Sequence, residues 1–324
     1  MKRREFITLL GGAAAWPLAA RAQQPAMPVI GFLGTDSTEL WATRLRAFRK
    51  ALSESGYDEG RNLTIEYRWA HGQYDRLATL AADLVQRQVT VIVANGPATM
   101  AAKAATTAIP IVFFVGFDPV KLGLVASLNR PGGNLTGVSN LSAELAPKRL
   151  ALLHELVPKA TIIALLVNPT NPNAETLSRD VQAAAGARGL TLHVLHASSE
   201  RDFDTAFATL LQQRVGALVI GTDGFFVAQS QRLAALTVRH AVPAIFQTHE
   251  FAATGGLISY GGSDMDGNRL LGLYTGRILK GEKPVDLPVQ QSTKVDLVIN
   301  LKTAKTLGLT VPLIMQMTAD EVIE

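Results

Sequence analysis

Residues 89–99 read VTVIVANGPAT, an almost uninterrupted run of apolar, mostly β-branched residues that ends in a small polar loop. Such a run, followed by a helical pattern, is typical of a strand buried on both faces of a parallel sheet. Residues 215–224, VGALVIGTDG, repeat this arrangement in the second half of the chain. The two stretches predict one parallel sheet in each half, with a loop at the carboxyl end of a central strand.

The segments around both stretches follow one another in the same order. Each half predicts a strand, a helix, an alternating edge strand and a second helix before its central strand, and later a proline that leads into a further strand. The first half places these segments at 29–33, 39–55, 63–67, 74–87 and 109–114; the second half places them at 162–167, 174–188, 190–195, 200–213 and 242–246. The repeat predicts an α/β protein of two doubly wound, Rossmann-like lobes.

Glycine-rich stretches mark where the chain is expected to cross between the lobes. The first crossing is predicted near 134–140 and the second near 255–262, and a helix at 266–280 and a final strand and helix follow. The resulting boundaries are 28–137 plus about 262–284 for the first lobe, and 138–261 plus about 285–320 for the second. Together these segments predict a hinge of two or three strands.

The first 22 residues are predicted to be a cleavable export signal. Lys2 precedes the pair Arg3-Arg4, a mildly apolar stretch follows, and residues 20–22 fit a small-x-small cleavage site, so the mature chain would begin at Gln23. The paired arginines favour twin-arginine export; an ordinary Sec leader is the alternative. The chain has no cysteine, which excludes an acylated lipoprotein anchor and disulfides. We therefore expect a free periplasmic protein, with a monomer as the default state.

Composition and motifs argue against several classes of protein. The net charge is +4, and part of it lies in the leader. The sequence has no stripe of basic residues of the kind that binds nucleic acid. No dinucleotide fingerprint, phosphate loop or nucleophile elbow is found, and the six histidines lack metal-ligand spacing. We expect no cofactor and no metal. A periplasmic enzyme using Asp36, Asp118 or His249 is an alternative, opposed by the lack of a paired nucleophile and base.

Ligands of open parallel sheets bind beyond the carboxyl ends of the strands, and two lobes facing each other enclose a cleft there. The loops expected at these ends are 34–37, 95–99, 115–118, 168–171, 221–226 and 247–250. In the second of these loops a helix is predicted to begin, and its free N–H groups favour a solute carboxylate. The residues at this helix start are Gly96, Pro97, Ala98 and Thr99. An ordinary strand-to-helix turn is the alternative for this loop.

Acidic and aromatic residues near strand ends supply further candidates. Asp223, beside Thr222, is the first choice for a solute ammonium, with Asp118 and Asp36 as alternatives. Helix caps and turns are the other common use of Asp beside Gly or Pro. The aromatic candidates for contact with an apolar part of the solute are Phe114, Phe225, Phe226 and Tyr260, and core packing is the alternative role for them. The remaining candidates are Ser139 and Asn140 at the hinge and Asn168 after a strand.

Several blocks resemble the ABC transporter substrate-binding family typified by tryptophan- and tyrosine-type binding proteins. They are residues 95–99, 109–113, 118–120, 123–125, 168–169, 300–302, 304–305 and 308–309, and above all RPGGNLTG at 130–137. The similarity runs from about Pro28 to Pro312.

The resemblance implies a type I periplasmic binding fold, a Venus-flytrap that closes on its solute without catalysis. It also implies delivery to a permease with its ATPase, aromatic amino acids among the family's ligands, and ligand-contact regions at 96–99, Asp118 and 222–223. A protein that presents its ligand to a membrane receptor is the alternative.

Overall fold

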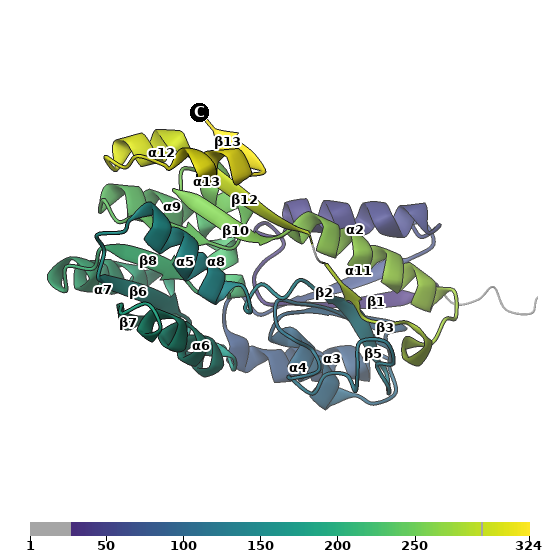
Figure 1. Cartoon of the computed structure of the whole chain (residues 1–324). Coiled ribbons are helices and arrows are strands. Elements are labelled where there is room, and N and C mark those ends of the chain that lie inside the picture. The colour runs from purple at the N-terminus through teal and green to yellow at the C-terminus, as the bar shows by residue number, and fades with distance from the viewer. Residues whose placement is uncertain (1–26, 293) are drawn as a thin grey trace, which may run out of the picture.

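The structure is a computed structural model that describes residues 27–292 and 294–324; the expected export leader lies outside the described residues. The chain forms two α/β lobes, each with its own sheet covered by helices on both faces (Figure 1). The expectation of two Rossmann-like lobes is thereby confirmed. Within the described ranges, no helix combines the length and the apolar character that crossing a membrane requires.

The first lobe is built on a sheet with the strand order β11-β5-β4-β3-β1-β2, in which every neighbouring pair is parallel. Its strands are β1 (Val29–Gly34), β2 (Thr64–Trp69), β3 (Val91–Asn95), β4 (Ile111–Val115), β5 (Leu135–Ser139) and β11 (Gln290–Gln291). All residues of β3, β4 and β5 are buried. Apolar runs predict this for β3 and β4, whereas the β5 segment is predicted only as a crossing between the lobes. The carboxyl ends of these strands therefore meet at one edge.

Helices cover both faces of the first sheet. One face carries α2 (Ala42–Glu54) and α11 (Asp264–Leu279); the other carries α3 (Leu77–Gln86), preceded by the short η1 (Tyr74–Arg76), and α4 (Ala98–Ala105). Gly272 lets α2 and α11 approach closely, since a Cβ at this position would lie 2.4 Å from the Phe48 carbonyl oxygen. A segment from late in the chain is thus packed firmly on the first lobe.

The second lobe has the strand order β13-β12-β10-β9-β8-β6-β7. Its strands are β6 (Ile162–Val167), β7 (Thr191–His196), β8 (Ala217–Ile220), β9 (Ala244–Phe246), β10 (Ile258–Gly262), β12 (Val295–Asn300) and β13 (Glu321–Ile323). The pairing is parallel except between β10 and β12. Its helices are α5 (Ala146–Leu156), α6 (Ala174–Gly186), α7 (Glu200–Gln212), α8 (Gly224–Ala228), α9 (Ser230–Arg239), α10 (His249–Ala253), α12 (Leu301–Thr306) and α13 (Leu313–Thr318).

The chain crosses between the sheets after β5, after β10 and after β11, which differs in position from the expected hinge. Residues 135–139 form the buried strand β5, so the first crossing begins only at Asn140, the last residue of the expected segment 134–140. The segment 285–291 stays with the first lobe, because Leu287 enters its core and β11 pairs with β5. The short helix η2 (Pro284–Asp286) leads into it. The first lobe therefore comprises 27–139 and 264–291, and the second comprises 140–262 and 295–324.

Candidate functional site

The carboxyl ends of both sheets face each other and enclose a small cavity of about 70 Å³ between the lobes. It will be called the cleft. Its lining comes from the loops after β3, β4, β6, β8 and β9, from the start of α2 and from the hinge. The lining residues are Trp41, Arg44, Asn95, Gly96, Pro97, Phe114, Gly116, Phe117, Asn140, Asn171, Thr222, Asp223, Gly224, Val227, Gln247 and Asp264.

Asp223 is the most densely hydrogen-bonded side chain of the cleft. It caps α8 by accepting from the Phe225 N–H at 2.9 Å, and it accepts from the amides of Asn168 at 3.2 Å and Asn171 at 2.7 Å. The Tyr74 hydroxyl of the first lobe donates to the same carboxylate at 3.1 Å. Burial raises the pKa of Asp223 to about 6, against these hydrogen bonds, which lower it. Asp223 therefore joins the two lobes with a carboxyl that titrates close to neutrality.

A second buried carboxyl, Asp36, faces Asp223 from the first lobe. It accepts hydrogen bonds from the Thr35 hydroxyl at 2.8 Å and from the Trp41 indole N–H at 3.0 Å. Burial raises its pKa, and its negative charge contributes to the raised pKa of Asp223. Asn95 donates to Thr35 at 3.2 Å and so ties the loop after β3 to this group. Asp223 lines the cleft and Asp36 lies behind it, so this side of the cavity is acidic and favours a cation.

Two amide oxygens that line the cleft have no hydrogen-bond partner among the described residues. They are Oδ1 of Asn95 and Oε1 of Gln247, one from each lobe. Buried polar atoms in a folded protein are usually hydrogen-bonded, so unpaired acceptors on residues that line a cavity favour a ligand that donates. The two unpaired oxygens therefore favour the same kind of ligand as the carboxylate of Asp223, one that donates hydrogen bonds.

Two arginines hold the cleft and its hinge together. Arg44, at the start of α2, contacts Glu250 at 3.4 Å and Asp264 at 3.5 Å, and it lines the cleft from the hinge side. Arg149 of α5 lies fully buried beneath the cleft, where it donates to Thr222 Oγ1 at 2.9 Å. Arg44 is thus placed to meet an anion in the cleft, whereas Arg149 supports the loop that carries Asp223.

The sequence-predicted residues divide between the cleft wall and its support. Those that line the cleft are Gly96, Pro97, Phe114, Asn140, Thr222 and Asp223. Asp36 and Asn168 stand behind the wall as hydrogen-bond partners. Ala98 and Thr99 are fully buried in the first turn of α4, where the N–H of Thr99 donates to the Gly96 carbonyl. The loop is a tight turn, and Thr99 Oγ1 has no hydrogen-bond partner among the described residues, so the role of this loop as a carboxylate site stays a prediction.

Five further predicted residues lie outside the lining and have other roles. The Asp118 side chain caps its own turn, accepting from the Val120 N–H at 2.8 Å. The Ser139 hydroxyl donates to the Phe117 carbonyl at 3.0 Å. Phe225 stacks on Phe203 in one hydrophobic cluster of the second lobe, and Phe226 packs on the same ring at a tilt. Tyr260 packs against a second hydrophobic cluster of that lobe. Asp118 and the two phenylalanines thus have structural roles here.

Several lining residues were not among the individual predictions. Asn95, Phe117, Asn171 and Gln247 lie in the predicted strand-end loops but were not singled out. Trp41, Arg44 and Asp264 lie at helix starts or at the hinge, and Tyr74 follows β2, so no strand-end rule selects them. No group of three or more His, Cys, Asp or Glu in the described ranges is arranged to hold a metal ion.

The sequence model of the ABC transporter substrate binding protein family matches residues 28–323. This chain belongs to that family. A tyrosine-binding protein of Clostridioides difficile (strain R20291) is 28% identical over 270 residues, covering 82% of this chain and 76% of the relative. Proteins of the family bind small-molecule solutes and interact with ABC permeases, and the relatives described here are solute-binding proteins rather than enzymes.

Solved structures agree with this membership. A domain from Streptococcus pneumonia, determined in complex with L-Trp, is 26% identical with a TM-score of 0.81, covering 92% of this chain and 100% of that one. A conserved domain protein from Vibrio cholerae is 26% identical with a TM-score of 0.83, covering 91% of this chain and 99% of that one. The fold of this substrate-binding protein is therefore the type I periplasmic binding fold.

Gly224 of the second lobe lies close to Thr35 of the first lobe, and its substitution should hinder closure. A Cβ at Gly224 would lie 2.9 Å from Thr35 Oγ1 across the cleft, and Thr35 cannot turn away without losing its bond to Asp36. We expect Gly224→Ala to weaken solute binding by about tenfold, since the closed form becomes less favourable. Calorimetric titration measures the effect.

Gly186→Ala is the matched control, because Gly186 ends α6 and an added Cβ there meets nothing within 4 Å. The control should keep the wild-type affinity. Equal affinities for the wild type and Gly224→Ala would mean that the lobes do not close to this contact.

Proposed function

We propose that this substrate-binding protein is the periplasmic component of an ABC importer and captures a zwitterionic aromatic amino acid in the cleft. The observation that carries the proposal is Asp223, a buried carboxyl in the cleft wall with hydrogen-bond partners from both lobes. A cation held by this group contacts both lobes at once and favours the closed form. The predicted leader supports the periplasmic location, and family membership supports delivery to a permease.

The charges of the cleft suit the two ends of an α-amino acid. The ammonium fits the acidic side formed by Asp223 and Asp36, with the free oxygens of Asn95 and Gln247 as further acceptors. The carboxylate fits Arg44, the guanidinium among the lining residues. This assignment replaces the loop at 96–99 as the proposed carboxylate partner. It keeps the two ends of the solute on separate sides of the cavity.

Aromatic side chains form the apolar part of the wall. Trp41 is 5% exposed and Phe114 is 8% exposed, and Phe117 lies between the lobes with them. Rings of this kind bind another ring by offset or edge contacts and gain from the apolar area removed from water. The L-Trp complex of the Streptococcus pneumonia relative and the name of the Clostridioides difficile relative agree with an aromatic solute.

The lobes have to part before such a solute can enter. The cleft encloses about 70 Å³, while pockets for small molecules usually measure ~300 Å³ or more. Polar contacts join residues of opposite lobes, among them the Tyr74–Asp223 hydrogen bond, the Arg44–Glu250 ion pair and the hydrogen bond from the Asp118 N–H to Glu144. Rotation about the hinge segments can break these contacts without unfolding either core, which is the motion expected of hinged domains.

The pKa of Asp223 predicts how solute affinity depends on pH. A carboxyl with a pKa of about 6 is largely ionised at neutral pH and largely protonated below its pKa. An ammonium needs the ionised form, so lowering the pH through this pKa removes its partner. We expect the dissociation constant to be about tenfold larger near pH 5 than near pH 7. Calorimetry across this range provides the measurement.

The variant Asp223→Asn should lose the pH dependence, whereas Asp118→Asn, which changes only a turn cap, should keep it. An affinity that stays constant from neutral to acidic pH in the wild type would contradict the ammonium assignment.

A thermal-shift panel tests the proposed solute class. The purified protein is heated with L-tryptophan, L-tyrosine, tryptamine and indole-3-propionate, which share a ring and differ in the charged ends. A bound solute at about 100 times its dissociation constant adds about 2.7 kcal/mol to stability, a rise of several degrees. The proposal requires shifts with the amino acids that exceed those with both analogues. Shifts with none of the four, or larger shifts with indole-3-propionate, would overturn it.

A further inference from the structure

A second cavity lies near the hinge, outside the cleft, and measures about 560 Å³. It will be called the hinge-side cavity. Its wall comes from the start of α2, from α10, β10 and β12, and from the first residues of α11, so both lobes and a hinge segment contribute. Arg44 and Asp264 also line the cleft and stand between the two spaces. A molecule in this cavity would thus lie beside the solute site without sharing Asp223.

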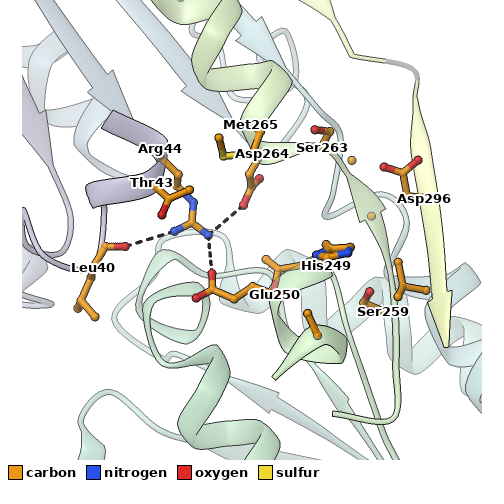
Figure 2. A pocket seen from close by; sticks show the side chains of 15 residues that line it. Leu40, Thr43, Arg44, His249, Glu250, Ser259, Ser263, Asp264, Met265 and Asp296 are labelled. Carbon is orange, nitrogen blue, oxygen red and sulfur yellow. Dashed lines mark hydrogen bonds and ion pairs between the residues drawn. The ribbon is translucent and has the colours of Figure 1, made fainter. Parts of the chain in front are cut away.

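Acidic groups dominate the chemistry of this cavity. Glu250 of α10, Asp264 of α11 and Asp296 of β12 converge on it, with Arg44 as the facing cation (Figure 2). Arg44 is already engaged by Glu250 at 3.4 Å and Asp264 at 3.5 Å. Asp296 forms an ion pair with Lys294 at 3.4 Å, and the side chain of this lysine is 69% exposed. His249, on the remaining side, pairs with Glu321 at 2.8 Å. The cavity is therefore lined by three carboxylates and one guanidinium, that of Arg44.

A buried hydroxyl points independently to a ligand. Ser259 of β10 is 1% exposed and lines the hinge-side cavity, and its Oγ has no hydrogen-bond partner among the described residues. Figure 2 shows its side chain on the same side of the strand as the cavity, below His249. An unpaired buried hydroxyl costs free energy that a ligand group can recover. Leu40, Ala253, Met265 and Val298 supply apolar surface around these polar groups.

We propose that the hinge-side cavity is a second binding site, for a small aliphatic amine whose ammonium meets Asp296 and Ser259. The carboxylates recognise the positive charge, the free hydroxyl completes its hydrogen bonding, and the apolar residues cover the methylene chain. Because both lobes line the cavity, the bound amine favours the closed form and so couples to the solute site. Recognition of the amine by Asp296 and Ser259 does not require that the solute of the cleft be an amino acid.

Calorimetric titration of the purified protein with putrescine, in the absence of any amino acid, tests the proposal. The expected result is binding of one putrescine with a dissociation constant below about 10 mM, and no binding of 1,4-butanediol, which has the same length without the charges. Asp296→Asn and Ser259→Ala should each weaken putrescine binding by about tenfold. The cleft variant Asp223→Asn should leave it within about threefold of the wild type.

Every other outcome contradicts the second site. Absence of binding would overturn it, as would equal binding of the diol, since the charge would then play no part. Loss of binding in Asp223→Asn with retention in Asp296→Asn would show that putrescine occupies the cleft. Thermal denaturation of each variant checks that it is folded, and Asp296→Asn preserves the shape of a side chain that is 26% exposed.

Discussion

Replacing Asp223 by Asn will weaken the binding of an amino acid solute by about a hundredfold, a loss of about 2.7 kcal/mol. A hydrogen bond between an ion and its charged partner accounts for ~1.5–3 kcal/mol, and this variant removes the charge. It also turns an acceptor into a donor. The amides of Asn168 and Asn171 both donate to Asp223, at 3.2 and 2.7 Å, so one of them would face an NH2 group. Calorimetry of the variant and the wild type provides the comparison.

The control for this prediction is Asp118→Asn, which removes a carboxylate of the same type from a loop outside the cleft lining. It should bind the solute as the wild type does. Thermal denaturation of Asp223→Asn establishes that the variant is folded. An affinity within about threefold of the wild type would mean that Asp223 only positions the loop and takes no part in holding the solute.

Replacing Arg149 by Ala will lower the free energy of unfolding by about 3 kcal/mol. The guanidinium is fully buried and donates to the Ser142 carbonyl at 2.7 Å, the Thr222 hydroxyl at 2.9 Å and the Tyr260 carbonyl at 3.2 Å. These acceptors belong to the first hinge segment, the cleft loop and the last residues of β10. The substitution removes these three hydrogen bonds, leaves the Thr222 hydroxyl with only its 3.3 Å bond to the Ser142 carbonyl, and opens a cavity. Urea denaturation gives the change.

Burial of the cation offsets part of this loss. It lowers the pKa of Arg149 to about 9, which indicates that the surroundings do not fully replace its hydration. Arg149→Met keeps most of the volume without the charge and should therefore be less destabilising than Arg149→Ala. Arg188, exposed at the end of α6, provides the surface control, and Arg188→Ala should stay within about 0.5 kcal/mol. A loss below about 1 kcal/mol in Arg149→Ala would show that this link is not a major support of the hinge.

The sheets could be predicted because their strands follow simple patterns. The apolar run that becomes β3 and its counterpart β8 identify the buried centres of the two sheets. The hinge boundaries could not be predicted in the same way. Strand β11 is only Gln290–Gln291, both exposed, and no hydrophobic pattern reveals that it pairs with β5. Its place follows from the tertiary packing of Leu287 and α11 on the first lobe.

The candidate site was only partly predictable for a related reason. Asp223 was accessible from the sequence, because a short loop after a buried strand places it at the sheet edge. Tyr74 and Arg44 belong to helical turns, and they reach the cleft only because of how the two lobes meet. Asp118 has the same sequence context as a ligand contact, yet its carboxylate bonds the N–H of Val120 in its own turn. Local sequence does not distinguish a turn cap from a ligand contact.

A crystal structure of the protein grown with the tighter-binding of L-tryptophan and L-tyrosine tests the central claim most directly. The account predicts the solute between the lobes, its ammonium within about 3 Å of an Asp223 carboxylate oxygen and its ring against Trp41 and Phe117. It also predicts that the carboxylate faces Arg44. An amino acid found in the hinge-side cavity or on the outer surface, with the cleft still closed by the Tyr74–Asp223 bond, would contradict it.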